Sequence, residues 1–368
     1  MSERIDAFVV CAPGLEPLAL AEVQRLGVRP ARTVKGGIEC TVTWPQLWSL
    51  HLRSRVATRV LVRVQRFRAE SFPALEAGMR HIDWSKWLAA DAAVEVQSSC
   101  DRGSALYHSG AVAERVATAV GRPEGRGQTV MVRIVDDVVT VSLDASGAGL
   151  HRRGWRGASG KAPLRETLAA TLVVASGWDP RRPLVDPFCG AGTVAIEAAM
   201  IARRMSPGRN RSFAFMEWPT FDERGWARVL RGADDDVIDR CPPIVGSDRD
   251  DGAIAAAIAN AATAGVGDNV VFERRTISDL MLPPRAGWIV TNPPYGKRVG
   301  DDVRDLYDRF GQVLRDRASD WQVALMAPKW TPVRRLGIPL HSALHTTNGG
   351  IAVDVLTTFG AETTVSGV

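Results

Sequence analysis

The residues best suited to chemistry in this sequence form one short run, Asn292-Pro293-Pro294-Tyr295, directly after the apolar residues 288–291. An exocyclic amine on a nucleobase is a poor nucleophile because its lone pair is delocalised into the ring, so an enzyme must hold the nitrogen and draw that pair toward an electrophilic methyl sulfonium. The side-chain oxygen of Asn292 can accept one N–H, the carbonyl of Pro293 can accept the other, and Tyr295 can stack on the base. Pro293 and Pro294 fix the turn before the substrate arrives. The run therefore predicts methyl transfer to a base nitrogen, with these four residues at the catalytic centre.

A second candidate site begins where the apolar strand 183–186 ends in Asp186. The turn that follows contains Gly190-Ala191-Gly192 and leads into an Ala-rich helix, an arrangement that presents backbone N–H groups to a ligand at the carboxyl edge of a doubly wound sheet. We expect glycines here because a side chain would collide with a bound nucleoside. The turn lacks the third glycine of a dinucleotide fingerprint and the lysine of a phosphate loop, which favours a cofactor without a pyrophosphate.

Two acidic residues end the next expected strands. Asp248 follows the strand 244–248 and could accept both hydroxyls of a ribose, although it could also cap the helix that comes next. Asp279 follows the strand 270–275 and could accept from an adenine amino group, or it could be an ordinary turn residue. The sequence leaves both alternatives open.

The elements that must position these residues divide the chain in three. Strands at 5–10 and 38–42 flank a helix over 15–27, which predicts a small α+β unit. A second α+β pattern runs from 94 to 143, in which Asp136-Asp137 is predicted to turn one strand into the next. Residues 149–160 form a Gly- and Arg-rich connection, called the crossing below. After it, the sequence pattern changes to apolar strands alternating with Ala-rich helices. We predict an N-terminal unit over 1–68, a second unit over 69–152 and an α/β domain over 153–368.

The positive charge is concentrated in the first part of the chain. Residues 1–160 hold 21 Lys and Arg against 16 Asp and Glu, whereas residues 161–368 hold 25 of each. This asymmetry suggests that the first part binds a polyanion, but a surplus of five charges is equally typical of solvated surface. Six arginines lie between Arg53 and Arg68, and we interpret this run as a strand whose basic face meets phosphates, with an ordinary wet sheet face as the alternative.

Composition excludes several other classes of protein. A chain of 368 residues with 45% hydrophobic and 24% charged side chains can bury more than one core. No apolar run approaches the roughly 20 residues that cross a bilayer, and the first residues lack a leader pattern, so we expect a cytoplasmic protein. The five cysteines are scattered and never form a CxxC pair, which argues against a disulfide framework and against a metal site.

The motifs together resemble a known family. DPFCGAGT, GSDRD and TNPPYGKR are similar to class I methyltransferases that modify exocyclic base nitrogens, and in particular to a subgroup with an N-terminal THUMP RNA-binding module. LHRRGWR and the residues up to 178, with PGRNRSFAFMEWP at 207–219, resemble bacterial enzymes that methylate the 2-amino group of a guanine in large-subunit (23S) ribosomal RNA. The resemblance covers the whole third unit and, less specifically, the first 150 residues.

The resemblance implies a fold, a cofactor and site residues. The fold would be an α/β, Rossmann-like class I methyltransferase domain preceded by ferredoxin-like and THUMP α+β units, and the cofactor would be S-adenosylmethionine. Residues 163–167 would lie near its methionine end. The implied cofactor-binding residues are Asp186, Phe188, Gly190, Gly192, Thr193, Asp248, Arg249, Asp279 and Thr167. The implied RNA-binding residues are Arg152, Arg153, Arg156, Arg209 and Arg211, with Arg203 and Arg204 nearby; solvated arginines are the alternative. Some members carry a second methyltransferase domain, for which this sequence has no room.

Three rival functions remain at this point. A transfer-RNA guanine methyltransferase has the same architecture, and a DNA adenine-amino methyltransferase uses a similar Asn-Pro-Pro-Tyr loop, although no groove-entering helix stands out here. Outside enzymes, an RNA-binding ribosome assembly factor could retain a vestigial cofactor fold. Binding of S-adenosylmethionine would separate the enzymes from the last of these.

Overall fold

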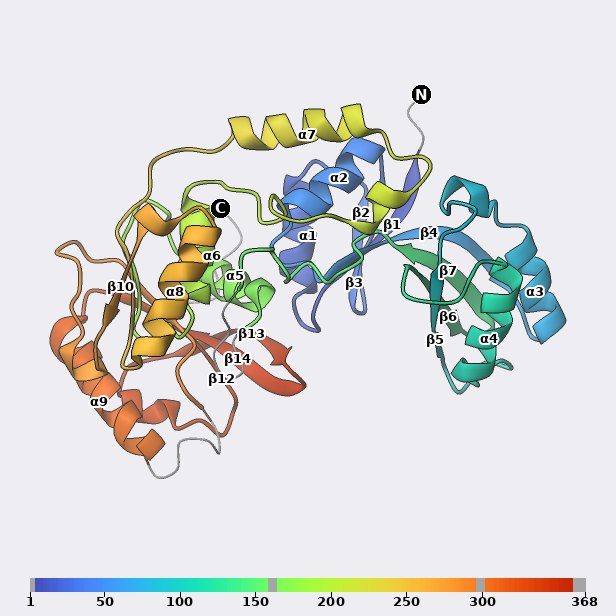
Figure 1. The fold of residues 1–368 in the computed structure, drawn as a ribbon. Coiled ribbons are helices and arrows are strands. Elements are labelled where there is room, and N and C mark those ends of the chain that lie inside the picture. Colours follow the sequence, from blue (N-terminus) through green and yellow to red (C-terminus); the bar gives the residue numbers. More distant parts are fainter. Residues whose placement is uncertain (1–3, 158–163, 296–301, 360–368) are drawn as a thin grey trace.

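The computed structural model of the protein describes residues 4–157, 164–295 and 302–359. Within these residues the strands form two seven-stranded sheets, one in the N-terminal half and one in the C-terminal half (Figure 1). The fold is mixed α/β, as the sequence predicts. No helix of the described residues is long and apolar enough to cross a membrane.

The first sheet joins both predicted N-terminal units. Its strand order is β2-β3-β1-β4-β7-β6-β5. The central strand β4 pairs antiparallel with β1 on one side and with β7 on the other, so the first two predicted units share one sheet. The predicted boundary at residue 68 coincides with the end of β4, the strand that both units share, and it stays a prediction. The strands are β1 (Ile5–Val10), β2 (Ala31–Val34), β3 (Gly37–Val42), β4 (Arg59–Arg68), β5 (Val94–Cys100), β6 (Gln128–Val135) and β7 (Val138–Asp144).

The helices of this half follow local signals. Thr43 caps α2 through a capping box with Gln46, and Ser71 caps α3. Asp136 and Asp137 both have positive φ, at 50° and 59°, and form the tight turn between β6 and β7 that the sequence predicts. The helices are α1 (Glu16–Arg25), α2 (Trp44–Arg53), α3 (Phe72–Arg80) and α4 (Ser109–Val120), with a short 3-10 turn η1 (Trp84–Lys86).

The second sheet carries the predicted cofactor half. Its order is β10-β9-β8-β11-β12-β14-β13, with the first five strands parallel and the last two antiparallel. Leu184 and Val290 pack in one apolar cluster, whereas their neighbours Val185 and Ile289 pack in another, so both faces of the sheet are covered. The strands are β8 (Leu184–Asp186), β9 (Ile244–Asp248), β10 (Val270–Arg274), β11 (Trp288–Thr291), β12 (Gln322–Ala327), β13 (His341–Asn348) and β14 (Ile351–Thr357).

The helices of the second half alternate with these strands. α5 packs on α6 and against β11 and β12, while α8 packs on β9 and β10. The described elements are α5 (Glu166–Ala175), α6 (Thr193–Ala202), α7 (Glu223–Asp235), α8 (Asp251–Thr263) and α9 (Asp302–Arg317), with the short turns η2 (Ala214–Glu217), η3 (Gly267–Asn269), η4 (Ile277–Asp279) and η5 (Val333–Leu336).

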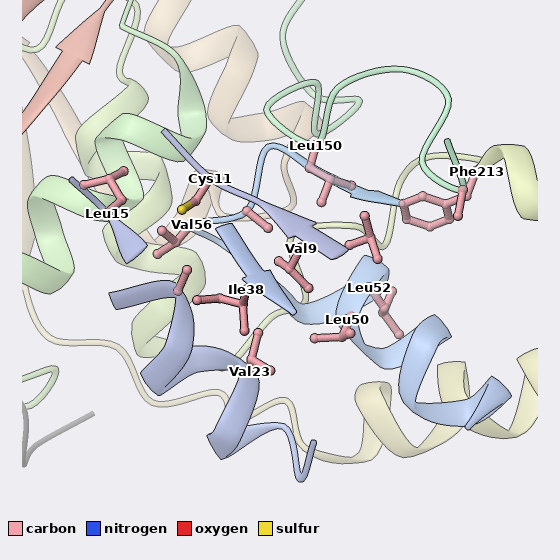
Figure 2. Packing of buried hydrophobic residues seen from close by; sticks show 14 of the residues in the cluster. Val9, Cys11, Leu15, Val23, Ile38, Leu50, Leu52, Val56, Leu150 and Phe213 are labelled. Carbon is pink, nitrogen blue, oxygen red and sulfur yellow. The ribbon is translucent and has the colours of Figure 1, made fainter. Parts of the chain in front are cut away.

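The insertion 206–235, between α6 and β9, turns back onto the N-terminal half. In Figure 1, α7 lies along α2, and the two helices are in contact. Phe213 and Leu150 join the core built on β1, β3, α1 and α2 (Figure 2). Trp218 stacks edge-on against Trp87 and donates from its indole N–H to Gln128 at 2.7 Å. The insertion is therefore a packed strap, and the region it forms with residues 51–56, 145–157 and α6 is called the joint below.

The arginine run of residues 53–68 is largely neutralised by the chain itself. Arg59 pairs with Asp144, and Arg63 pairs with Glu39 while lying over the Phe8 ring. Arg53, Arg55 and Arg68 pair with Asp236, Glu197 and Glu70 respectively. These carboxylates, all but Glu70 distant in sequence, relieve the self-repulsion that pointed to phosphates. The phosphate interpretation of this run loses that argument and stays a prediction.

Candidate active site

The glycine turn between β8 and α6 is built from left-handed backbone. Gly190 has φ +50°, and a Cβ there would meet no other heavy atom within 4 Å, so this part of the turn is open. Gly192 has φ +84° and caps the start of α6. A Cβ on Gly192 would lie 2.8 Å from the ring of Phe272 and 3.0 Å from Ala257. Gly192 is therefore required by protein packing as well as by its positive φ, whereas Gly190 leaves space where a ligand could approach.

Asp248 faces this turn and is not a helix cap. Its Oδ2 accepts the backbone N–H of Gly190 at 3.0 Å, and its Oδ1 accepts the N–H of Asp250 at 3.1 Å. The cap of α8 is Asp250, whose side chain accepts from Ala253. The capping alternative for Asp248 is wrong, and its half-buried carboxylate is held at the carboxyl end of β9 with lone pairs left to accept hydroxyl groups.

Asp186 connects the glycine turn to the strand that carries the catalytic run. It is 1% exposed, and its Oδ1 accepts from the Thr291 hydroxyl at 2.6 Å and from the Phe188 N–H at 3.3 Å. Burial, which outweighs these hydrogen bonds, raises the pKa of this carboxyl to about 7. Because Thr291 directly precedes Asn292, this bond fixes the turn relative to the proposed base-binding residues.

The run Asn292 to Tyr295 leaves the sheet at the same edge. The side-chain Oδ1 of Asn292 is buried, and in the described part of the chain it has no hydrogen-bond partner. Pro293 is buried and Pro294 is exposed. The Tyr295 hydroxyl accepts from the side-chain amide of Asn348 at 2.8 Å, and burial raises the pKa of this phenol. A buried acceptor without a partner is costly in an isolated protein, so Asn292 is prepared to accept a hydrogen bond from a bound molecule.

The other expected cofactor residues surround this edge in different ways. Phe188 is half-buried and packs edge-on against Phe310, with ring centroids 5.2 Å apart. Asp279 lies in η4, is exposed, and accepts from the Thr276 hydroxyl at 2.7 Å, so its carboxylate is anchored but open to solvent. Arg249 is exposed after β9. Thr167 and Thr193 are 3% and 5% exposed at the starts of α5 and α6. Residue 163 lies outside the described residues.

Comparison with known proteins identifies the family. Residues 153–351 match the RMKL-like methyltransferase domain, and residues 6–61 match the RlmL ferredoxin-like domain. The chain belongs to the RMKL-like methyltransferase family. It is 34% identical over 356 residues to ribosomal RNA large subunit methyltransferase K/L of Methylococcus capsulatus, covering 90% of this chain and 48% of that protein. It is 31% identical to slr0064 of Synechocystis, provisionally named an RNA methyltransferase, over 95% of both chains. The chain thus spans about half the length of the K/L relative and nearly all of slr0064.

Solved structures share the whole architecture of this RMKL-like chain. SMU.472, provisionally named a methyltransferase and crystallised with SAH, superposes with a TM-score of 0.88 at 28% identity, over 98% of this chain and 99% of that one. A Listeria monocytogenes protein named as a predicted N6-adenine-specific DNA methylase superposes with a TM-score of 0.88 at 30% identity, over 97% of both chains. The methyltransferase fold and the preceding ferredoxin-like unit are therefore confirmed.

The arginines expected to bind RNA have mostly other roles in this RMKL-like chain. Arg153 is 2% exposed, pairs with Glu197 at 3.2 Å and donates to the carbonyls of three residues. Arg156 donates to Glu166, to the Leu164 carbonyl and to the Thr193 hydroxyl, so it ties the crossing to the cofactor turn. The structure gives no support for RNA contact by Arg153, whose guanidinium is buried and fully paired. The Nη1 of Arg156 has no hydrogen-bond partner among the described residues, so RNA contact by Arg156 stays a prediction.

The insertion arginines follow the same pattern. Arg211 donates to four backbone carbonyls between residues 146 and 152 and lies 4.8 Å from the Phe213 ring centroid, which makes it a clamp on the crossing. Arg203 donates to Ile238, Asn269 and Asp239. Arg209 is exposed and pairs with Asp234, while Arg152 and Arg204 are exposed and have no carboxylate partner among the described residues. Arg152 and Arg209 stay predicted RNA contacts; Arg211 is not supported as one.

Two residues at the catalytic edge escape detection by sequence reasoning. Asn348 contacts Tyr295 from the β13–β14 hairpin, and Trp330 is exposed after β12. Neither forms a motif with its sequence neighbours. The available signal for Asn348 was its position before Gly349-Gly350, a turn sequence that predicts a hairpin but not where that hairpin lies.

Proposed function

We propose that the protein transfers a methyl group from S-adenosylmethionine to the exocyclic 2-amino group of a guanine in RNA, and that large-subunit ribosomal RNA is the substrate. The observation that carries this proposal is the buried Oδ1 of Asn292, which has no hydrogen-bond partner among the described residues and follows the residue hydrogen-bonded to Asp186. An amine on a flat base supplies the donor that this oxygen lacks. The names of the relatives support RNA as the substrate class.

The residues of the turn fit a nucleoside cofactor. Gly190 leaves an open approach to the backbone, and Asp248 presents a carboxylate beside it that could accept the ribose hydroxyls. Asp279 would accept from the adenine amino group, and Phe188 would offer an apolar ring. Thr167, Thr193 and Arg249 are placed around the same strand ends and complete the proposed cofactor site.

In the transfer, a bond forms between the guanine nitrogen and the methyl carbon while the carbon–sulfur bond breaks, its electron pair stays on sulfur, and the nitrogen loses one proton to solvent. The protein contributes orientation. Asn292 accepts one N–H of the amino group and the Pro293 carbonyl accepts the other, which turns the nitrogen lone pair out of the ring plane. Tyr295, held by Asn348, stacks on the base. None of these side chains needs to act as a base.

The test is the variant Asn292→Ala. We expect methylation of ribosomal RNA from a strain lacking the enzyme to fall by at least about a hundredfold, because a positioned acceptor is lost from the reacting nitrogen. Equilibrium binding of S-adenosylmethionine should stay within about twofold of the parent protein. Asn210→Ala, which changes an exposed asparagine of the insertion, is the matched control and should keep full activity.

Mass spectrometry of the digested product identifies the acceptor. Detection of 2-methylguanosine in 23S RNA supports the proposal, whereas methylation confined to transfer RNA or to adenine in DNA would replace it with one of the rival activities. Absence of cofactor binding by the parent protein would favour the assembly-factor alternative. Methylation by Asn292→Ala near the parent rate would overturn the role of the loop.

A further inference from the structure

Trp330 leaves the second sheet at the same edge as the catalytic run. β12 is the parallel neighbour of β11, with Leu325 opposite Thr291. Parallel strands end at a common edge, so residues 328–331 after β12 emerge beside residues 292–295 after β11. The β13–β14 hairpin ends at this edge too, because Asp354 pairs with Ala327 and Asn348 reaches Tyr295.

The side chain of Trp330 is presented to solvent by an anchored turn. It is 62% exposed, the highest fraction among the exposed large apolar residues of the described chain. The turn itself is fixed, because the N–H of Thr331 donates to the Pro328 carbonyl at 3.0 Å and Thr331 is only 6% exposed. The exposure therefore belongs to the indole and not to a loosely held segment.

The chemistry of this turn matches a nucleotide. An indole face stacks on any base, and base–aromatic stacking is sequence-tolerant because every base has a π-face. Lys329, also exposed, provides a cation next to the ring for a neighbouring phosphate. A protein partner would call for a wide apolar patch. Of the other exposed large apolar residues of the described chain, only Ile351, at the start of β14, belongs to a strand next to β12, whereas Tyr107, Ile258, Val271 and Met281 lie on other segments.

We propose that Trp330 stacks on an RNA base next to the target guanine, with Lys329 contacting the adjoining phosphate, so that the flanking strand is held while the target enters the Asn292 site. This inference rests on the proposed function, since it takes RNA to be the molecule at the catalytic edge. It adds a subsite on β12 to the residues contributed by β8, β9 and β11.

The experiment compares Trp330→Ala and Trp330→Phe in the full-length protein, with ribosomal RNA and S-adenosylmethionine varied separately. We expect Trp330→Ala to raise the KM for RNA by about tenfold, with kcat and the KM for S-adenosylmethionine within about twofold of the parent. Trp330→Phe should recover most of the loss, because a phenyl ring still stacks. Ile258→Ala, which removes an exposed apolar side chain from α8, is the control and should leave all three parameters unchanged.

A second readout does not depend on turnover. Titration with a single-stranded RNA oligonucleotide should quench tryptophan fluorescence more in the parent protein than in Trp330→Phe, and the difference reports stacking on this one indole. An RNA KM for Trp330→Ala within twofold of the parent, or identical quenching in the two proteins, overturns the proposal. If the parent binds and quenches with RNA but methylates another substrate, the proposed reaction fails while the stacking subsite stands.

Discussion

Arg153, in the joint, pairs with Glu197 and donates to three backbone carbonyls, whereas Asn292, at the catalytic edge, has a buried oxygen with no partner in the part of the chain that the structure describes. The joint contains most of the arginines that the sequence made attractive for RNA, and it uses them to hold the two halves together. The catalytic edge also carries charged groups, Asp248 and Lys329 among them, but in the described residues it leaves the Asn292 oxygen and the Trp330 ring open. We therefore place the proposed function at the open acceptor and the exposed ring of this edge, and not where the arginines are densest.

The largest expected effect on stability comes from removing a buried charge in the joint. Glu197 has 0% exposure and pairs with both Arg153 and Arg55. Glu197→Gln would leave two arginines in or near the interior without a counter-charge, and we expect a loss of about 3–5 kcal/mol in the free energy of unfolding. Urea denaturation followed by circular dichroism measures this change.

The control for Glu197 is the exposed pair of Arg209 and Asp234, whose side chains are 48% and 46% exposed. Arg209→Ala should change stability by less than about 1 kcal/mol, because solvent already screens this pair. Equal losses in the two variants would mean that the joint gains nothing from burying its charges.

The pH dependence of stability sharpens the comparison between the joint and the catalytic edge. A buried titratable group in each region changes stability with pH, and the two groups do so in opposite directions. In the joint, burial against Phe213 and Phe215, with a further contribution from Arg211, lowers the pKa of His51 to about 3. Below pH 6.5 the His51 imidazole binds a proton in the unfolded chain but stays neutral in the folded chain. His51 therefore lowers the free energy of unfolding as the pH falls. At the edge, the pKa of Asp186 is raised to about 7, so this group destabilises the fold as the pH rises from about 4 to 7.

Differences between variants isolate the two groups. Relative to the parent, the free energy of unfolding of His51→Phe should increase by about 1.4 kcal/mol for each pH unit that the pH falls below 6.5. Relative to the parent, the free energy of unfolding of Asp186→Asn should instead increase as the pH rises from about 4 to 7. Urea unfolding at pH 5.0, 6.0 and 7.0 gives both slopes. Slopes of the same sign would contradict the assignment of opposite protonation preferences to the joint and the edge.

The smallest effect concerns the positioning of Tyr295. Asn348→Ala removes the 2.8 Å hydrogen bond to the Tyr295 hydroxyl while leaving the ring in place. We expect kcat to fall about three- to tenfold, the effect of one neutral hydrogen bond, with cofactor affinity and unfolding free energy near parent values. Asn348→Ser, which can still donate, should recover part of the rate. A change in cofactor affinity with kcat unchanged would contradict this prediction, because it would assign Asn348 to the cofactor site and not to the base-binding residues.

The sequence predicted the elements whose signals are local. The strand-turn-helix patterns at Asp186 and Asp248 and the strand that ends before Asn292 each lie within a few residues, and each forms the expected elements. The turn at Asp136-Asp137 was likewise predicted, because it depends on backbone preferences of adjacent residues. The helix α2 and the strap role of the insertion were missed, since their apolar faces make sense only against each other.

Sequence by itself determined that three parallel strands would end in polar groups and that these ends would share one edge. The spacing of apolar residues, the residues of the turns and the alternation of strands with helices are all read from residues close together in the chain. Only the tertiary structure decided which charges are already paired, since Arg55 meets Glu197 only when the two halves pack, and Arg59 meets Asp144 only when β4 pairs with β7. The same packing decided which groups stay open. Desolvation and pairing depend on contacts between distant segments, and so a residue's availability for a substrate emerges with the fold.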